Sequence, residues 1–212
     1  MRMLMRLSLC VGAAVYAQMA LASISYNVLQ ATISYQNGDS NTLDSVVNGN
    51  TITFTSPSTM KVGGDAWTND GHAAADITII YTVESDVAIH GIDLSFSGEV
   101  QNFASLGYSE LVESWSPGGG AGSVFASTSG LFKGDGLPGG SDGAFTQTTT
   151  LNFDPVFSYK VKKTFSLHDL DLNPELSFAR LDSVEQTAVP EPASMTALAL
   201  GGLGLLARRR RK

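Results

Sequence analysis

The stretch DITIIYTVESDVAIHGIDLSFSGE, residues 76–99, decides the fold class of this 212-residue chain. Apolar side chains occupy every second position in both of its halves, as Ile77, Ile79, Tyr81 and Val83, then Ile92, Leu94 and Phe96. A period of two places one face of a β-strand in the core and the other in water. We therefore predict two strands, 76–84 and 87–99, joined through Ser85-Asp86 as an antiparallel hairpin.

Further strands are predicted on both sides of this stretch, because the same alternation recurs between turn sequences rich in Gly and Asn. They span residues 24–35, 43–47, 51–55, 124–129, 145–153, 157–162 and 176–184. Residues 164–167 either continue the strand at 157–162 or pair separately. Residues 106–112 instead favour a short helical turn. Many short strands with almost no helical period are typical of an all-β protein, so we predict an antiparallel β-sandwich or jelly roll over residues 23–187.

The N-terminal end, residues 1–22, has the features of a secretory signal peptide. A charged start precedes an apolar stretch, and Ala20 and Ala22 form an A-x-A site. This site predicts cleavage before Ser23. We expect the Sec translocon and signal peptidase as partners, and a signal-peptide helix in the precursor.

The C-terminal end, VPEPASMTALALGGLGLLARRRRK at residues 189–212, has three parts. The triplet Pro190, Glu191 and Pro192 precedes an apolar run, and the cations Arg208, Arg209, Arg210, Arg211 and Lys212 follow it. As a helix, the 15 apolar residues 193–207 reach about 22 Å. A hydrocarbon core is about 30 Å thick, but cations snorkel and bilayers thin. We predict a transmembrane helix whose cationic end is retained in the cytoplasm.

This tail resembles a PEP-CTERM sorting signal, the tag of exosortase substrates in Gram-negative bacteria. The resemblance covers residues 188–212 and implies export and an exosortase as partner. It also implies a transient anchor in the inner membrane, cleavage near Pro190–Pro192, and delivery to the cell surface or extracellular matrix. Such tags occur on many unrelated domains, often in bacteria that make exopolysaccharide, so they do not identify residues 23–187.

The predicted mature domain is strongly acidic. Between Ser23 and Val189 there are six cations and 19 acids, a formal charge of −13. This charge argues against nucleic acid and anionic lipid as partners. The single cysteine, Cys10, lies in the predicted signal peptide, so we expect neither a disulfide nor thiol chemistry in the exported domain.

Catalytic motifs are absent from the sequence, and we predict no enzyme and no catalytic residue. The histidines lack H-E-x-x-H spacing, and there is no G-x-S-x-G elbow. A glycosidase with two carboxylates remains an open alternative. The available acids are Glu84, Glu99, Glu110, Glu113 and Glu175.

A cation site is considered at Asp169, Asp171, Asn173 and Glu175, which alternate as in the first half of a calcium loop. Pro174 stands where such a loop needs Gly, so an edge strand with acids facing water is the alternative. Asp135 and Asp142, with the glycines between them, are a second candidate. No other cofactor is expected.

Aromatic side chains suggest a glycan site, because loop tryptophans stack on sugar rings. The candidates are Trp67, Trp115 and Tyr108; the alternative is that they cap the core. Two threonine ranks form another surface feature, Thr51, Thr53 and Thr55, and Thr146, Thr148 and Thr150. Such ranks can order water or ice, but threonine is also common on the solvent face of ordinary strands.

The resulting hypothesis is an exported surface or matrix protein with a structural or adhesive role linked to exopolysaccharide. The first alternative is a carbohydrate-binding module with a loop aromatic site. The second is a secreted hydrolase.

Overall fold

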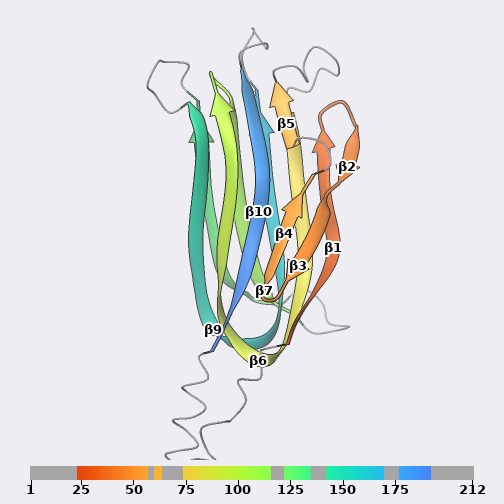
Figure 1. Cartoon of the computed structure of the whole chain (residues 1–212), viewed down its shortest axis with the longest axis vertical. Coiled ribbons are helices and arrows are strands. Elements are labelled where there is room, and N and C mark those ends of the chain that lie inside the picture. Colours follow the sequence, from red (N-terminus) through yellow and green to blue (C-terminus); the bar gives the residue numbers. More distant parts are fainter. Residues whose placement is uncertain are drawn as a thin grey trace, which may run out of the picture. The chain divides into compact units, whose positions relative to one another are not determined.

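The computed structural model describes residues 23–56, 60–63, 74–115, 122–134, 142–169 and 177–191. Residues Ser23–Glu191 form one compact unit (Figure 1). Its strands are β1 (Ile24–Tyr35), β2 (Ser40–Thr42), β3 (Asp44–Asn48), β4 (Thr51–Thr55), β5 (Met60–Gly63), β6 (Ala74–Gln101), β7 (Ser105–Ser114), β8 (Val124–Lys133), β9 (Gly143–His168) and β10 (Phe178–Pro190). All their pairings are antiparallel, and the described residues contain no helix, so the all-β prediction is confirmed.

The predicted hairpin at residues 76–99 is wrong, because both runs belong to the single strand β6. The two halves do not pair with each other. Residues 75–85 pair with β1, while residues 89–101 pair with β10. The β6–β9 ladder shifts register between Glu84 and Ile89, and Figure 1 shows β6 turning back there. Ser85-Asp86 therefore marks a bend that carries one strand from one layer to another.

Strand β9 bends in the same way beside β6. The prediction separated it into two strands at Asp154-Pro155, but the structure has one continuous strand. Pro155 is tolerated because it lies where the ladder is interrupted, between the pairs Gly91–Asn152 and Ile89–Val156.

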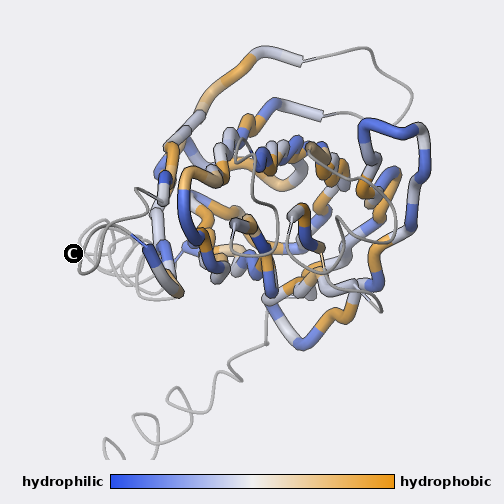
Figure 2. Tube along the Cα trace, turned by 90° about the horizontal axis from the view of Figure 1, so that it is seen from above, coloured by the Kyte–Doolittle hydropathy of each residue, from blue (hydrophilic) through white to orange (hydrophobic). Residues whose placement is uncertain are grey.

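The bends divide the sheet into two layers. The first layer has the order β2–β1–β6–β9–β7–β8 and uses the N-terminal half of β6 and the C-terminal half of β9. The second layer has the order β9–β6–β10–β4–β3, with β5 also beside β10, and uses the other halves. Figure 2 shows these strands nearly end-on, with hydrophobic and hydrophilic residues alternating.

The two layers pack face to face through alternate apolar side chains. The Tyr81 ring of the first layer lies 5.6 Å from the Phe54 ring of the second. Phe96 of the second layer lies 5.2 Å from Phe165 of the first. These side chains are at most 1% exposed. Burial of one such side chain contributes about 1.5–3 kcal/mol, so the alternation in sequence drives the packing.

The helical turn predicted at residues 106–112 is also wrong, since these residues belong to β7. Leu106 and Val112 point into the core, and so does Glu110, which is 2% exposed. A carboxylate at an inward position interrupted the apolar alternation. The period of two was therefore not recognised, and the strand was not predicted.

A polar cluster lies in the middle of this core. Lys163 of β9 donates to Glu110 of β7, and Tyr81 of β6 donates to Gln186 of β10. Burial lowers the pKa of the Lys163 ammonium, and the Glu110 carboxylate opposes this shift. Burial, with a smaller contribution from Glu110, raises the pKa of Tyr81 and Tyr159 well above the usual value. Because Tyr81 reaches Gln186, the cluster connects the two layers.

Candidate functional site: a hydroxyl-lined surface on β7 and β8

The outer face of the first layer is hollowed where β8, β7 and β9 lie side by side. Ser109 of β7 pairs with Ser129 of β8 on one side and Thr164 of β9 on the other. Leu111 pairs in the same way with Ser127 and Lys162. Directly paired residues project to the same face of a sheet. Because the alternate side chains of β7 and β9 point into the core, the side chains between them, including these, gather on the outer face.

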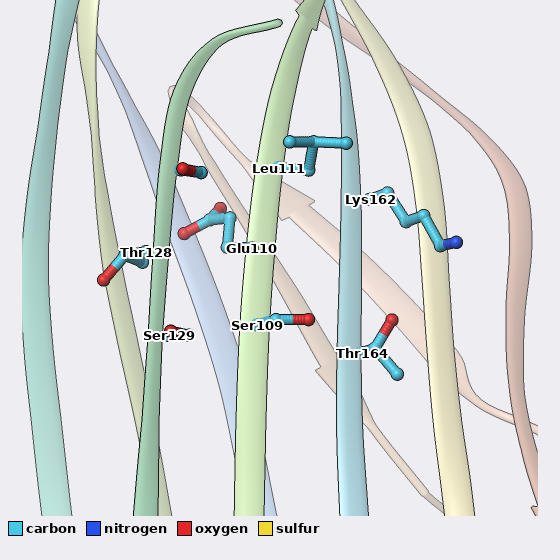
Figure 3. A pocket seen from close by; sticks show the side chains of 8 residues that line it. Ser109, Glu110, Leu111, Thr128, Ser129, Lys162 and Thr164 are labelled. Carbon is cyan, nitrogen blue, oxygen red and sulfur yellow. The ribbon is translucent and has the colours of Figure 1, made fainter.

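The hollow has a volume of about 480 Å³. It is lined by Ser109, Glu110, Leu111, Ser127, Thr128, Ser129, Lys162 and Thr164. In Figure 3, Ser109, Leu111, Lys162 and Thr164 point to one side of the sheet, and Glu110 and Thr128 point to the other. The accessible surface of the hollow is therefore made by hydroxyl groups, one leucine and one lysine.

The polar groups of the hollow are available to a ligand. Within the described part of the chain, the hydroxyls of Ser109, Ser127, Ser129 and Thr164 make no side-chain hydrogen bond. Lys162 forms no ion pair with any described residue. A hydroxyl both donates and accepts, so these residues can satisfy a ligand that does the same.

A second hollow, of about 330 Å³, lies at the start of β7. It is lined by Phe103, Ala104, Ser105, Lys133 and Gly134. Phe103 is 59% exposed, and Leu131, opposite Gly107 between the two hollows, is 58% exposed. We call the outer side chains of β7 and β8, with Phe103, Lys162 and Thr164, the β7–β8 track. At about 3.3 Å per residue, the β7 part of the track extends about 20 Å from Ser105 to Leu111.

The tight turn before β7 gives Phe103 its position. Asn102 and Phe103 have φ angles of 42° and 38°, in the left-handed region that non-glycine residues rarely adopt. This turn carries the chain from β6 of the second layer to β7 of the first. Backbone strain of this kind costs about 1–3 kcal/mol per residue. The turn leaves the ring of Phe103 exposed to solvent at one end of the track.

The outer face of the second layer brings the two threonine ranks onto one surface. Thr148 pairs with Ser95, Ser95 with Glu185, and Glu185 with Thr53, across β9, β6, β10 and β4. Several hydroxyls of this face bond to neighbours. Thr51 and Thr187 are 2.8 Å apart, Ser97 and Ser183 are 3.1 Å apart, and Thr150 donates to Asp93 over 2.6 Å.

The predicted glycan residues do not form one group in the structure. Tyr108 packs inside the first layer, with its ring 4.7 Å from Phe96 and 6.3 Å from Phe132. Trp115 follows β7, is half-buried, and accepts a hydrogen bond from Ser158 at its carbonyl over 2.8 Å. Trp67 lies outside the described residues.

The predicted calcium residues are described only in part. Asp169 is 5% exposed and accepts a hydrogen bond from Ser177 over 2.5 Å. Asp171, Asn173 and Glu175 lie outside the described residues, as does Asp135. Asp142 accepts a hydrogen bond from the Asn102 amide over 3.0 Å. Within the described ranges, no three His, Cys, Asp or Glu side chains are grouped to hold a metal.

The processing residues lie at the two ends of the compact unit. The Ser23 amide donates to Asp86 over 2.8 Å. Pro190 ends β10, and the Glu191 amide donates to the Ala88 carbonyl over 2.8 Å. Ala20, Ala22, Pro192 and Arg208–Arg211, with both predicted helices, lie outside the described residues. The part of the chain that is described has no helix of membrane-spanning length and hydropathy.

Sequence reasoning missed the β7–β8 track, because serine and threonine on an outer face carry no motif. Lys163 could have been found. Phe157, Tyr159 and Val161 occupy alternate positions, and continuing this period of two places Lys163 on the same face as the buried Tyr159 and Val161. A buried lysine requires a buried acid as its partner, and Glu110 would then have been sought.

Comparisons with known proteins give weak structural likenesses. The enzymatically active domain of tailspike protein 4 from bacteriophage CBA120 is 12% identical over 80% of this chain, with a TM-score of 0.32, and this chain spans 20% of it. TmCBM61, solved with β-1,4-galactotriose, is 10% identical over 80% of this chain and 89% of its own, with a TM-score of 0.32. The family 11 carbohydrate-binding module of Clostridium thermocellum, solved with a mixed-linked tetrasaccharide, is 10% identical over 84% and 94%, with a TM-score of 0.29. These scores carry no argument about what this chain binds.

The C-terminal end gives a sequence match. A search of curated protein sequences finds no match to this chain. The sequence model of the PEP-CTERM protein-sorting motif matches residues 188–212, the same residues on which the resemblance was based. Such a motif implies export and processing by an exosortase. The chain is therefore one that carries a PEP-CTERM protein-sorting motif at its C-terminal end.

Proposed function

We propose that this is an exported, non-catalytic surface or matrix protein whose β7–β8 track binds polysaccharide. In this proposal, Sec exports the precursor, an exosortase in the inner membrane processes the tail, and residues 23–187 form a jelly-roll-like β-sandwich that works outside the cell. The observation that carries the binding role is the hollow of about 480 Å³. It is lined by Leu111, Lys162 and four hydroxyls that have no side-chain hydrogen bond to any described residue.

The chemistry of the track suits a sugar chain. Each sugar ring has hydroxyl groups around its edge and C–H groups on its faces. Ser109, Ser129 and Thr164 offer hydrogen bonds to the edge, while the exposed Leu131 and Phe103 offer apolar contact to the faces. An aromatic ring also stacks favourably on a sugar. The length of about 20 Å along β7 favours an extended polymer over a small molecule.

The charge of the domain favours a neutral polymer. At a formal charge of −13, residues 23–189 repel a polyanion at long range. Lys162 then acts as a hydrogen-bond donor to sugar hydroxyls. When several copies of the protein bind the same polymer chain, they associate with the matrix, and this association is the proposed structural role.

The test is affinity electrophoresis of the purified protein in gels that contain neutral polysaccharides, acidic polysaccharides or exopolysaccharide from the native host. We expect slowed migration with at least one neutral polymer. The double variant Ser109→Leu/Ser129→Leu should reduce affinity at least tenfold, because it removes two hydrogen bonds and fills the hollow. The matched control is Thr53→Leu/Ser95→Leu on the second layer, which should bind like the natural protein. Equal losses in both variants, or no slowing in any gel, would contradict the proposal.

The loop aromatic site stays a separate candidate, because Trp115 lies at the other end of β7. The same gels test it with Trp115→Ala and Trp67→Ala. A loss confined to these variants would move the site from the track to the loops.

A further inference from the structure

The buried lysine and glutamate of the polar cluster face each other directly. The β7–β9 ladder pairs Glu110 with Lys163, and both side chains point into the core with 0% and 1% exposure. Nζ of Lys163 contacts Oε1 of Glu110. The other oxygen, Oε2, is buried and has no hydrogen-bond partner within the described part of the chain. The nitrogen of a lysine side chain therefore touches a carboxyl group whose second oxygen has no partner among the described residues.

We propose that Lys163 and Glu110 become joined by an intramolecular amide bond after the domain folds. The reaction begins with proton transfer from the ammonium to the carboxylate, which gives a neutral amine and a neutral carboxylic acid. The lone pair of Nζ attacks Cδ of Glu110 and forms the C–N bond. The C–O bond to Oε2 breaks, and this oxygen leaves with two protons, one from the acid and one from Nζ, as water. No oxidant, reductant or other reactant is needed.

The surroundings favour the neutral reactants. Two ions are costly to hold in an apolar interior, and burial of Lys163 lowers the pKa of its ammonium. The titratable groups facing the pair are the phenols of Tyr81 and Tyr159, whose raised pKa values keep them protonated. The Tyr159 hydroxyl is buried, has no partner among the described residues, and lies near enough to Glu110 for the carboxylate to raise its pKa. In the proposed reaction it is the candidate donor to the developing oxyanion.

The product removes two unfavourable features of the core. An amide carries no net charge, so it replaces a buried ion pair by one polar group. The orphaned Oε2 also leaves with the water, which removes an unsatisfied polar atom.

The bond would give this domain the covalent link that its sequence otherwise lacks. Its only cysteine is Cys10, in the predicted signal peptide. An amide between residues 53 positions apart would close the chain between β7 and β9 in the unfolded state, as a disulfide does. Unlike a disulfide, it would not depend on the redox state outside the cell.

A tryptic peptide map of the full chain, denatured before digestion, tests the proposal. No lysine or arginine lies between Lys61 and Lys133, so Glu110 lies in peptide 62–133. Trypsin does not cut after an acylated lysine. We expect peptide 62–133 joined to peptide 163–180, at their summed mass less one water. Recovery of separate peptides 62–133 and 164–180 at their own masses would overturn the proposal, and this readout needs no variant to fold.

Variants give a second, independent readout. Lys163→Met should abolish the joined peptide, whereas Lys160→Met, a solvent-facing lysine on the same strand, should retain it. The double variant Glu110→Leu/Lys163→Met keeps an apolar core. If the natural protein holds only an ion pair, this double variant should melt at the same or a higher Tm. We expect a lower Tm, because the cross-link is lost; an unchanged or higher Tm would contradict the proposal.

Discussion

The outer faces of the two layers are both rich in hydroxyl groups, yet they differ in what those groups do. On the second layer several hydroxyls bond to neighbours, as between Thr51 and Thr187, and between Thr150 and Asp93. On the first layer those of Ser109 and Ser129 line a hollow and have no such partner among the described residues. Composition alone therefore does not distinguish the hollow from the face of the second layer; hydrogen-bond satisfaction and curvature do.

The largest expected effect is a difference in unfolding free energy between a substitution in the core and one in the hollow above it. Lys162 and Lys163 are adjacent in β9 but point to opposite faces. Lys163→Ala should lower the free energy of unfolding by about 3–5 kcal/mol, because it leaves the Glu110 carboxylate buried alone. Lys162→Ala should stay within about 0.5 kcal/mol, as expected of a surface change. Denaturant unfolding monitored by tryptophan fluorescence measures both, and equal effects would mean that the two faces are wrongly assigned.

High pH should destabilise both layers together, because the buried tyrosines lie in the core that the two layers share. Burial raises the pKa of Tyr26 to about 12, with a small opposing effect from the Ala188 backbone. A raised folded-state pKa contributes stability that is complete below about pH 10 and is lost as the pH rises through 12. Tyr26 should contribute about 2 kcal/mol of this loss.

Thermal unfolding at pH 9, 10, 11 and 12 measures the alkaline loss. Tyr26→Phe should reduce the pH dependence, while the buried Tyr81 and Tyr159 still contribute in the same direction. A Tm for the natural protein that stays constant from pH 9 to 12 would be inconsistent with these shifts.

Removing a charged hydrogen-bond donor inside the hollow should weaken polysaccharide binding more than removing one beside it. Lys162→Ala should weaken polysaccharide binding about tenfold, since a hydrogen bond from a charged group is worth about 1.5 kcal/mol or more. Lys160→Ala, whose side chain is on the same face but outside the hollow, should bind within twofold of the natural protein. Titration calorimetry with the polymer found by electrophoresis provides the comparison.

The smallest expected effect concerns the paired hydroxyls of the second layer. Thr51→Val removes one partner of the Thr51–Thr187 bond and should lower the free energy of unfolding by about 0.5–1 kcal/mol. Ser109→Ala removes no hydrogen bond to any described residue and should leave stability unchanged. If Ser109→Ala proved the more destabilising of the two, the contrast between the faces would fail.

The sequence predicted strands well where one face is wholly apolar, as in β1, β4 and both halves of β6. It failed at β7, because Glu110 occupies a core position whose partner, Lys163, lies 53 residues away. It also read the bend at Ser85-Asp86 as a turn, since local residues do not specify whether two halves pair with each other or with other strands. The hollow depends on register among β7, β8 and β9, and no local pattern encodes that register.

The ends of the compact unit leave it at the same bend of β6. Ser23 bonds to Asp86 and Glu191 to Ala88, two positions apart, or about 7 Å along an extended strand. A short linker could therefore join residue 191 to residue 23, and new ends could be opened at the Gly49 turn between β3 and β4. Such a circular permutant would keep β7, β8 and β9 uninterrupted, and it would make the domain insertable into a loop of a host protein as a compact binding unit.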